Sequence, residues 1–265
     1  MTTRHVLVAA AAATVIAVTS ACGTSSTPSA SSSQRPSATL TTASATASPS
    51  TTTAGPSTPA ADALSACTEL GGTVGSDGVC TVHTETPGYT VDMNFPTDYP
   101  DQRALTDLLT HHQDQFVAFV EEPPVRNVPH ALGMRGQSYR SGAPTSGTES
   151  LVFEVYQDTG GAHPNTAYSA LNYDLAAQAP ITFETLFKPG SDPVAVLDPI
   201  VKAEFEKRLD GTTLDDNLLG AKTYQNFALQ DDAVIFFIGQ GMWAFEAAGP
   251  QQFSIPRSDL ESILA

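Results

Sequence analysis

The composition of the chain changes at Asp62, and this change confines folding to the C-terminal part. Of the 39 residues from Gly23 to Ala61, all but five are Ser, Thr, Pro or Ala. Such a segment has almost no apolar side chains to bury against the entropy cost of ordering, so we expect a disordered stalk over 22–61. Its typical reach is roughly 35 Å for a random coil. The 204 residues from Asp62 to Ala265 are enough for one large domain or two small ones.

The first 21 residues have the pattern of an export signal peptide. Arg4 precedes an apolar run that is shorter than the ~20 residues a membrane-spanning helix needs. Thr19-Ser20-Ala21-Cys22 resembles the lipobox at which bacterial lipoproteins are cleaved and lipidated. Cys22 is therefore the predicted lipidation site, which makes the chain extracytoplasmic and anchored to the bacterial membrane or envelope. Cleavage after Ala21 without lipidation would instead release a secreted protein.

The folded region is strongly acidic. It contains all 28 acidic residues and ten of the twelve basic ones, which gives a formal charge of 10 − 28 = −18. This charge disfavours nucleic acid and anionic lipid headgroups as partners, and a cationic protein or glycan is electrostatically easier. A surface that serves only solubility is the alternative.

Cys67 and Cys80 are the two cysteines that remain after Cys22. An even pair in an oxidising compartment usually forms a disulfide, and four glycines between the two residues allow the chain to turn back. A zinc site is not expected, because two cysteines lack a histidine at ligand spacing. No phosphate-binding glycine loop or nucleotide motif occurs, so we expect no metal and no cofactor.

Hydrophobic patterns in the folded region predict strands and helices that come in groups. Period-two alternation predicts strands at 79–85, 89–95 and 151–157, and further strands are expected at 131–140, 166–175, 224–229 and 253–255. The run from Val234 to Ile238 is apolar on both faces, which predicts a central, covered strand at 233–238. Helices are predicted from Pro100-Asp101 to Val120, over 193–209 after an Asp192 cap, and over 257–264, with a kink or split at Pro199. Grouped elements predict an α+β fold with a mainly antiparallel sheet.

Short motifs along the folded region carry a family resemblance. They include Val155-Tyr-Gln157, Gly160-Gly-Ala-His-Pro164, Tyr224-Gln-Asn-Phe-Ala228, Glu246-Ala-Ala-Gly-Pro250 and Pro256-Arg-Ser258. Through them, residues 66–265 resemble a family of secreted mycobacterial immunogenic antigens, and the second half resembles the RsiV-like domain of a membrane anti-sigma factor that senses lysozyme.

The resemblance implies an α+β, β-grasp-like architecture with packed helices in two subdomains. We place these at 62–140, which includes the disulfide, and at 141–265, the RsiV-like part. The resemblance implies no settled activity, since some relatives are called esterases and others are known mainly as antigens. The stalk and the lipobox depart from a freely secreted antigen.

A serine esterase needs a nucleophile, a base and an oxyanion hole. No serine has the Gly-x-Ser-x-Gly pattern, and the nearest is Ser138 in Gly136-Gln-Ser-Tyr-Arg140. Ser138 is thus the first candidate nucleophile, with Ser141 and Ser146 as unranked others. Serine nucleophiles also occur without the motif, so its absence does not exclude this chemistry.

His163 is the candidate base, because it lies in a glycine-rich loop between two predicted strands. It is also a candidate binding residue. Asp174 could orient a histidine. The alternatives are that His163 caps backbone groups in a turn and that Asp174 belongs to the turn that ends its strand. Trp243 and Phe245 could expose an aromatic patch for sugar or protein binding, with burial in the core as the commoner fate.

His111, His112 and Asp114 lie on one predicted helix. His111 and Asp114 have the spacing of metal ligands, but no third ligand is evident, so a solvated helix face is the favoured interpretation. His112 falls on the apolar stripe of the helix and is predicted to be a satisfied core residue.

Together these features favour a binding or interaction module over an enzyme. A cationic protein of the lysozyme type is the partner indicated jointly by the charge and the RsiV-like resemblance. One alternative is a cell-envelope serine esterase with His163 as its base. Another is a host-interacting antigen, whose partner would be a host protein.

Overall fold

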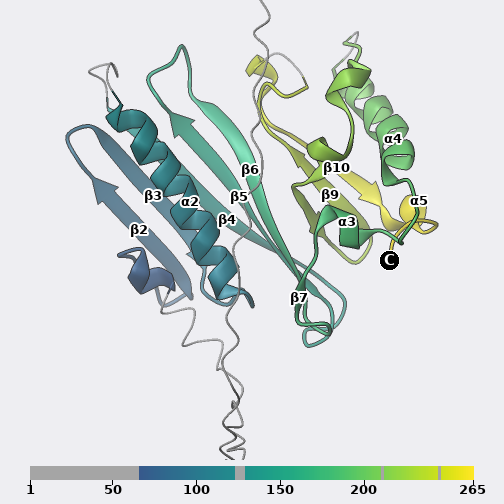
Figure 1. Cartoon of the computed structure of the whole chain (residues 1–265), viewed down its shortest axis with the longest axis horizontal. Coiled ribbons are helices and arrows are strands. Elements are labelled where there is room, and N and C mark those ends of the chain that lie inside the picture. Colours follow the sequence, from purple (N-terminus) through teal and green to yellow (C-terminus); the bar gives the residue numbers. More distant parts are fainter. Residues whose placement is uncertain (1–65, 123–128, 210–211, 244–245) are drawn as a thin grey trace, which may run out of the picture. The chain divides into compact units, whose positions relative to one another are not determined.

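The computed structural model describes residues 66–122, 129–209, 212–243 and 246–265 (Figure 1). All of them belong to one compact unit, Thr53–Ala265. The predicted signal peptide, Cys22, the stalk, residues 62–65 and Phe245 lie outside the described residues. No helix in the described part of the chain is long and apolar enough to cross a membrane.

A seven-stranded sheet forms the first half of the unit, with its strands side by side in chain order. Only β3 and β4 are parallel, and helix α2 connects them; the other neighbours are antiparallel. The predicted α+β class with a mainly antiparallel sheet is therefore confirmed. The strands are β1 (Thr73–Val74), β2 (Val79–Glu85), β3 (Tyr89–Pro96), β4 (His130–Ser141), β5 (Thr148–Asp158), β6 (Asn165–Asp174) and β7 (Ala179–Pro180).

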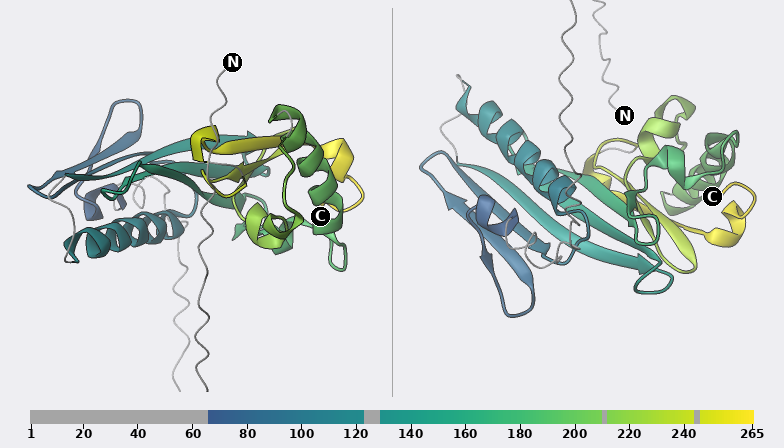
Figure 2. Two further views of the ribbon diagram at one scale, coloured as in Figure 1. Left: turned by 90° about the horizontal axis from the view of Figure 1, so that it is seen from above. Right: turned by 60° about the horizontal axis from the view of Figure 1, so that its bottom comes forward.

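Helix α2 (Gln102–Glu121) covers one face of this sheet, as in a β-grasp (Figures 1 and 2). Alternation places one row of buried side chains under it, and the residues facing each other across the strands are Val82, Met93, Met134 and Val155. Leu105, Leu109 and Phe116 pack down from the helix. Asp101 caps it by accepting the Ala104 N–H at 3.0 Å, so Pro100 precedes the cap rather than entering the first turn.

A three-stranded antiparallel sheet in the order β10-β9-β8 carries the second core. Its strands are β8 (Phe227–Leu229), β9 (Ala233–Ile238) and β10 (Gln251–Pro256), so the apolar β9 is central as predicted. The helical segments around it are α3 (Phe183–Leu186), α4 (Pro193–Arg208), α5 (Arg257–Leu260), η1 (Asp216–Leu218), η2 (Ala221–Tyr224) and η3 (Glu246–Ala248).

Helix α4 begins at the predicted cap, where Asp192 accepts the Ala195 N–H at 3.1 Å. The predicted split at Pro199 is wrong, because helical residues continue unbroken on both sides of it. A proline at this position removes the hydrogen bond to the Ala195 carbonyl, but this loss does not end the helix.

Two predicted elements differ because tertiary contacts override local pattern. Tyr224 ends the 3-10 helix η2 instead of starting a strand, since its hydroxyl donates to Asp198 at 2.7 Å and its ring packs on Phe236. The predicted helix over 257–264 ends at Leu260, because the last residues pair with the chain near Phe187.

The predicted subdomain boundary after Arg140 falls inside the β4–β5 hairpin, which pairs from Ala131 with Asp158 to Ser141 with Thr148. The seven-stranded sheet therefore continues across that position. The buried residues divide instead between Tyr173 and Phe183, where one core ends and the next begins. A small cluster of Val152, Tyr168, Ala228 and Phe237 joins the two halves.

Candidate functional site

The three residues proposed for an esterase triad do not meet. Ser138 faces Leu151 on β5, which faces Leu171 on β6. Strand β6 begins at Asn165, which is six residues, or about 20 Å, along the strand from Leu171 in the Ser138 row. His163 precedes Asn165 in the loop and so lies beyond this end of the strand. Asp174 ends the same strand nine residues from Asn165, about 30 Å away. These positions cannot form a Ser–His–Asp constellation.

His163 has a different partner that the sequence did not indicate. Its Nε2 pairs with the carboxylate of Glu246 from η3, and its Nδ1 lies 3.0 Å from the Pro164 carbonyl oxygen. Gly160 in the same loop has a φ of 72°, a left-handed conformation that favours glycine. The His163 loop is thereby tied to the second half of the unit.

Asp174 and the candidate serines also have structural surroundings. The Asp174 carboxylate accepts the N–H groups of Ala176 and Ala177 at 2.8 and 2.9 Å, which is the turn that the sequence favoured. Ser138 is exposed in the middle of β4. The hydroxyl of Ser141 accepts a hydrogen bond from Arg257 at 3.1 Å.

Trp243 lies in the second core rather than in an exposed patch. It is 5% exposed, its Nε1 donates to the Leu218 carbonyl at 2.9 Å, and its ring contacts Phe205, Tyr224 and Phe253. Trp243 therefore does not form an exposed aromatic patch, and burial in the core is the outcome. In the first core, the predicted disulfide between Cys67 and Cys80 is present, with the two Cα atoms 5.9 Å apart.

The structure brings together one serine and one histidine that the sequence did not pair. His112 on α2 and Ser169 on β6 are 57 residues apart, and His112 Nε2 lies 2.8 Å from Ser169 Oγ. Both side chains are half-buried. The apolar stripe correctly directed His112 toward the sheet, but no local signal shows which strand lies beneath that turn of α2.

His112 has the protonation state that a general base needs. Burial lowers its pKa below 6.5, and the neighbouring His111 lowers it further. The imidazole is therefore neutral at pH 7, and in the tautomer with a bare Nε2 the Ser169 hydroxyl donates to it. A hydroxyl hydrogen-bonded to a neutral imidazole is the starting arrangement for nucleophilic attack on an ester.

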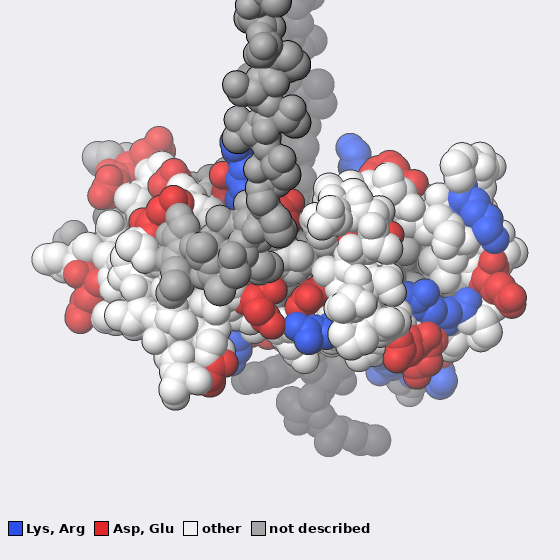
Figure 3. Space-filling model, turned by 90° about the horizontal axis from the view of Figure 1, so that it is seen from below, with Lys and Arg blue, Asp and Glu red and all other residues white. Residues whose placement is uncertain are grey.

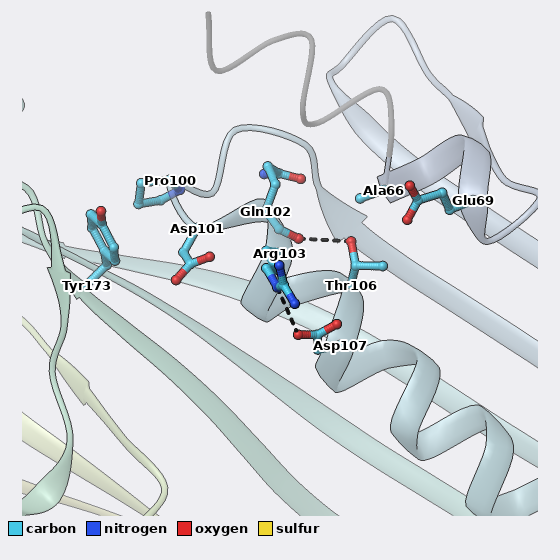
Figure 4. Close-up of a pocket in the computed structure, with 9 residues that line it drawn as sticks. All are labelled: Ala66, Glu69, Pro100, Asp101, Gln102, Arg103, Thr106, Asp107 and Tyr173. Carbon is cyan, nitrogen blue, oxygen red and sulfur yellow. Dashed lines mark hydrogen bonds and ion pairs between the residues drawn. The ribbon is translucent and has the colours of Figure 1, made fainter. Parts of the chain in front are cut away.

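A cavity of about 650 Å³ lies at the N-terminus of α2 (Figure 4). Tyr173 and Asp101 line one side and Glu69 the other. Its polar groups are used within the fold, because Asp101 caps α2, Arg103 pairs with Asp107 at 3.7 Å, and the Thr106 hydroxyl donates to the Gln102 carbonyl. This cavity therefore presents no activated nucleophile.

Acidic side chains dominate the first half of the unit. Residues 66–180 contain four basic and 14 acidic residues, a formal charge of −10. In the view of Figure 3, acidic side chains prevail at the α2 end, and Lys and Arg are mixed with acids at the other end. In the described part of the chain, no group of three or more His, Cys, Asp or Glu could hold a metal ion.

Comparison with known proteins gives the family. A family described as "Protein of unknown function (DUF3298)" matches residues 184–258, the part that holds the second core. Esterase Rv3036c of Mycobacterium tuberculosis (strain H37Rv) is 43% identical over 202 residues, 76% of this chain and 89% of that protein. Immunogenic protein MPT64 of the same strain is 37% identical over 201 residues, 75% of this chain and 88% of that protein. The chain belongs to this family of mycobacterial esterase and immunogenic proteins, as the sequence motifs predicted.

A solved DUF3298 family protein from Pseudomonas aeruginosa PAO1 is also similar, at 19% identity and a TM-score of 0.48 over 71% of this chain and 94% of that one.

Proposed function

We propose that the chain is a carboxylic-ester hydrolase in which Ser169 is the nucleophile and His112 is the general base. The observation that carries the proposal is the 2.8 Å contact between His112 Nε2 and Ser169 Oγ. The 43% identical relative named as an esterase supports it. The sequence alone favoured a binding module over an enzyme, because no serine and histidine could be placed together. The proposal reverses that preference.

The reaction follows acyl transfer through a covalent intermediate. Ser169 Oγ attacks the ester carbonyl carbon while His112 Nε2 accepts the hydroxyl proton, and the tetrahedral intermediate collapses to an acyl-serine. The departing alkoxide takes the proton from His112. A water molecule then repeats the sequence, which releases the carboxylic acid and restores the Ser169 hydroxyl. Ser169 and His112 form a dyad, since no carboxylate of a described residue bonds to His112.

An apolar side chain lies further along the helix face that carries His112 and favours an ester whose acyl chain is long enough to reach it. Phe119 is seven residues beyond His112 on α2, so it lies on the same helix face about 10.5 Å further along. It is 56% exposed, so its ring is open to a ligand. We expect Phe119 to contact the acyl chain of a substrate bound at Ser169.

Hydrolysis of nitrophenyl acetate, butyrate and octanoate by the purified chain tests the proposal. Ser169→Ala and His112→Gln should each lower kcat/KM by ~10²-fold or more. Ser138→Ala and His163→Ala are matched controls that should retain activity, because neither residue lies at the dyad. Unfolding temperatures close to wild type would show that the variants fold. Turnover that survives Ser169→Ala would refute the assignment.

The binding module remains the second candidate function, and the charge of −10 over residues 66–180 favours it. Its partner would be a cationic protein held by long-range attraction. Such binding should weaken steeply between 50 and 500 mM salt, because exposed charges are screened over ~10 Å at 0.1 M. Titration with hen lysozyme at both salt concentrations checks this; salt-independent affinity would contradict it. A host protein as the partner of a secreted antigen is the third proposal, for which the relative's name is the support.

The proposed site of action is outside the cytoplasm. The Cys67–Cys80 disulfide fits an oxidising compartment. We further propose lipidation of Cys22, which would hold the chain at the envelope through its stalk. Cys22→Ala should shift the protein from the detergent phase to the culture medium on fractionation; unchanged partition would contradict lipidation.

A further inference from the structure

The face of the seven-stranded sheet opposite α2 carries polar and aromatic side chains in register. One row crosses five strands and consists of Thr81, Asn94, Arg135, Glu154 and Tyr168. The next row contains His83, Asp92, Gly133, Tyr156 and Thr166. The alternate residues of the same strands point to the α2 core, so these rows are a second surface of the sheet rather than part of that core.

The three-stranded sheet covers only one end of this face. The Leu229 N–H donates to Ser150 Oγ at 3.0 Å, and Asn172 Nδ2 donates to the Phe227 carbonyl at 3.0 Å. Phe237 of β9 packs on Tyr139 and Tyr168, with ring centroids 5.8 and 5.2 Å apart. No described element covers the remaining face over β2 to β4, and Figure 2 shows α2 on its other side.

Two adjoining cavities open on this face, the first where the two sheets meet and the second over strands β3 to β5. The first, of about 270 Å³, lies between Tyr139, Tyr168 and Gln252, with Phe237 behind them. The second, of about 280 Å³, lies over Gly133 beside Tyr156. Arg135 and Glu154 line both, so the two cavities are neighbours across β4 and β5, and together we call them the groove.

The groove offers hydrogen-bonding groups that the fold does not use. Arg135 and Glu154 face each other across β4 and β5, and both are exposed. Neither side chain forms a hydrogen bond or ion pair with another described residue. Gln137 next to them is exposed as well. Tyr156 is 39% exposed, and Gly133 opposite it leaves the side of its ring open. Donors, acceptors and aromatic faces therefore converge here. Among the charged lining residues, Arg135 opposes Glu154, and Asp92 pairs with His83 outside the lining.

We propose that this groove binds an uncharged oligosaccharide. Sugar rings present hydroxyl groups at their rims and C–H groups on their faces, and the electron-rich face of a tyrosine ring attracts such C–H groups. Arg135 supplies hydrogen-bond donors, Glu154 supplies acceptors and Gln137 supplies both. Such groups fix the orientation of sugar hydroxyl groups in a site of this size. Two neighbouring cavities match two successive rings of a chain that continues over the uncovered sheet. A peptide added by strand pairing would need a sheet edge, whereas the groove lies on a face.

Calorimetric titration of the full chain tests the proposal, with the N-acetylglucosamine tetramer and cellotetraose as probes. Saturable binding of at least one probe is expected, and Tyr156→Ala and Glu154→Gln should each weaken it at least tenfold. Glu154→Gln removes only a charge from an exposed side chain, so it keeps the test valid if Tyr156→Ala fails to fold. Gln115→Ala, an exposed change on α2, is the matched control and should bind as wild type.

Absence of binding by both probes at 5 mM, or binding that both groove variants leave unchanged, would overturn the proposal. Ester hydrolysis by the same variants should stay at the wild-type rate, because Ser169 lies on the opposite face of β6 from Tyr168. The oligosaccharide proposal and the hydrolase proposal can therefore be supported or refuted independently.

Discussion

Replacement of Trp243 by alanine should destabilise the second core without affecting either proposed site. The side chain is 5% exposed and contacts three aromatic rings, so its removal leaves a cavity in a packed interior. Comparable Trp→Ala changes cost about 3–5 kcal/mol. For a domain of about 200 residues, 1 kcal/mol corresponds to roughly 2–4 °C in Tm, so a fall of about 6–20 °C is expected.

Thermal unfolding followed by circular dichroism measures the effect. Trp243→Phe is the matched variant, because it retains most ring contacts and loses the Nε1–H donation to the Leu218 carbonyl. The Leu218 carbonyl still accepts from the Thr223 hydroxyl at 2.9 Å, so the change removes one hydrogen bond, worth about 0.5–1.5 kcal/mol, and this variant should fall between wild type and Trp243→Ala. A Tm of Trp243→Ala within 2 °C of wild type, or loss of ligand binding at unchanged Tm, would refute the core assignment.

Three further results are expected. Replacing Cys67 and Cys80 by serine should cost about 3 kcal/mol in the chain-entropy model, measured by urea unfolding, and equal midpoints would contradict it. Gly147→Ala should cost about 1–3 kcal/mol in the same assay, because a Cβ there would overlap the Ser141 carbonyl oxygen; wild-type stability would show that the hairpin loop moves easily. The folded-state pKa of His112 is lowered, so the unfolded chain binds the proton more tightly and this group's contribution to stability should fall as pH drops below 6.5. His112→Gln should remove this dependence of stability on pH. In the ester assay, kcat/KM of the wild type should fall at acid pH with an inflection below 6.5, and an inflection above 6.5 would contradict a buried base.

Periodicity identified most elements of the fold, because alternation and helical spacing are local properties. Strands β2 and β9 and the cap of α4 lie where the pattern placed them. The errors occur where a distant contact decides the conformation. Tyr224 bonds to Asp198 across 26 residues, and the C-terminal segment pairs near Phe187 instead of extending α5.

The proposed sites depend on strand order and register, which the sequence did not supply. Ser169 and His112 are ordinary in their own segments and are brought together only because one turn of α2 contacts β6. Alternation likewise predicts that Glu154 and Arg135 are exposed on their strands. That they face each other follows only from the β4–β5 register. By contrast, His163 was conspicuous in its glycine-rich loop, yet its partner Glu246 lies in another segment.

Covalent labelling by a fluorescent serine-reactive phosphonate is the most direct test of the hydrolase assignment. The purified chain is labelled at pH 7, digested, and the modified residue is located by peptide mass spectrometry. The dyad predicts one modified serine, Ser169, and loss of labelling in His112→Gln because the nucleophile is no longer activated. Labelling of a different serine, or none under conditions that label a control esterase, would contradict it.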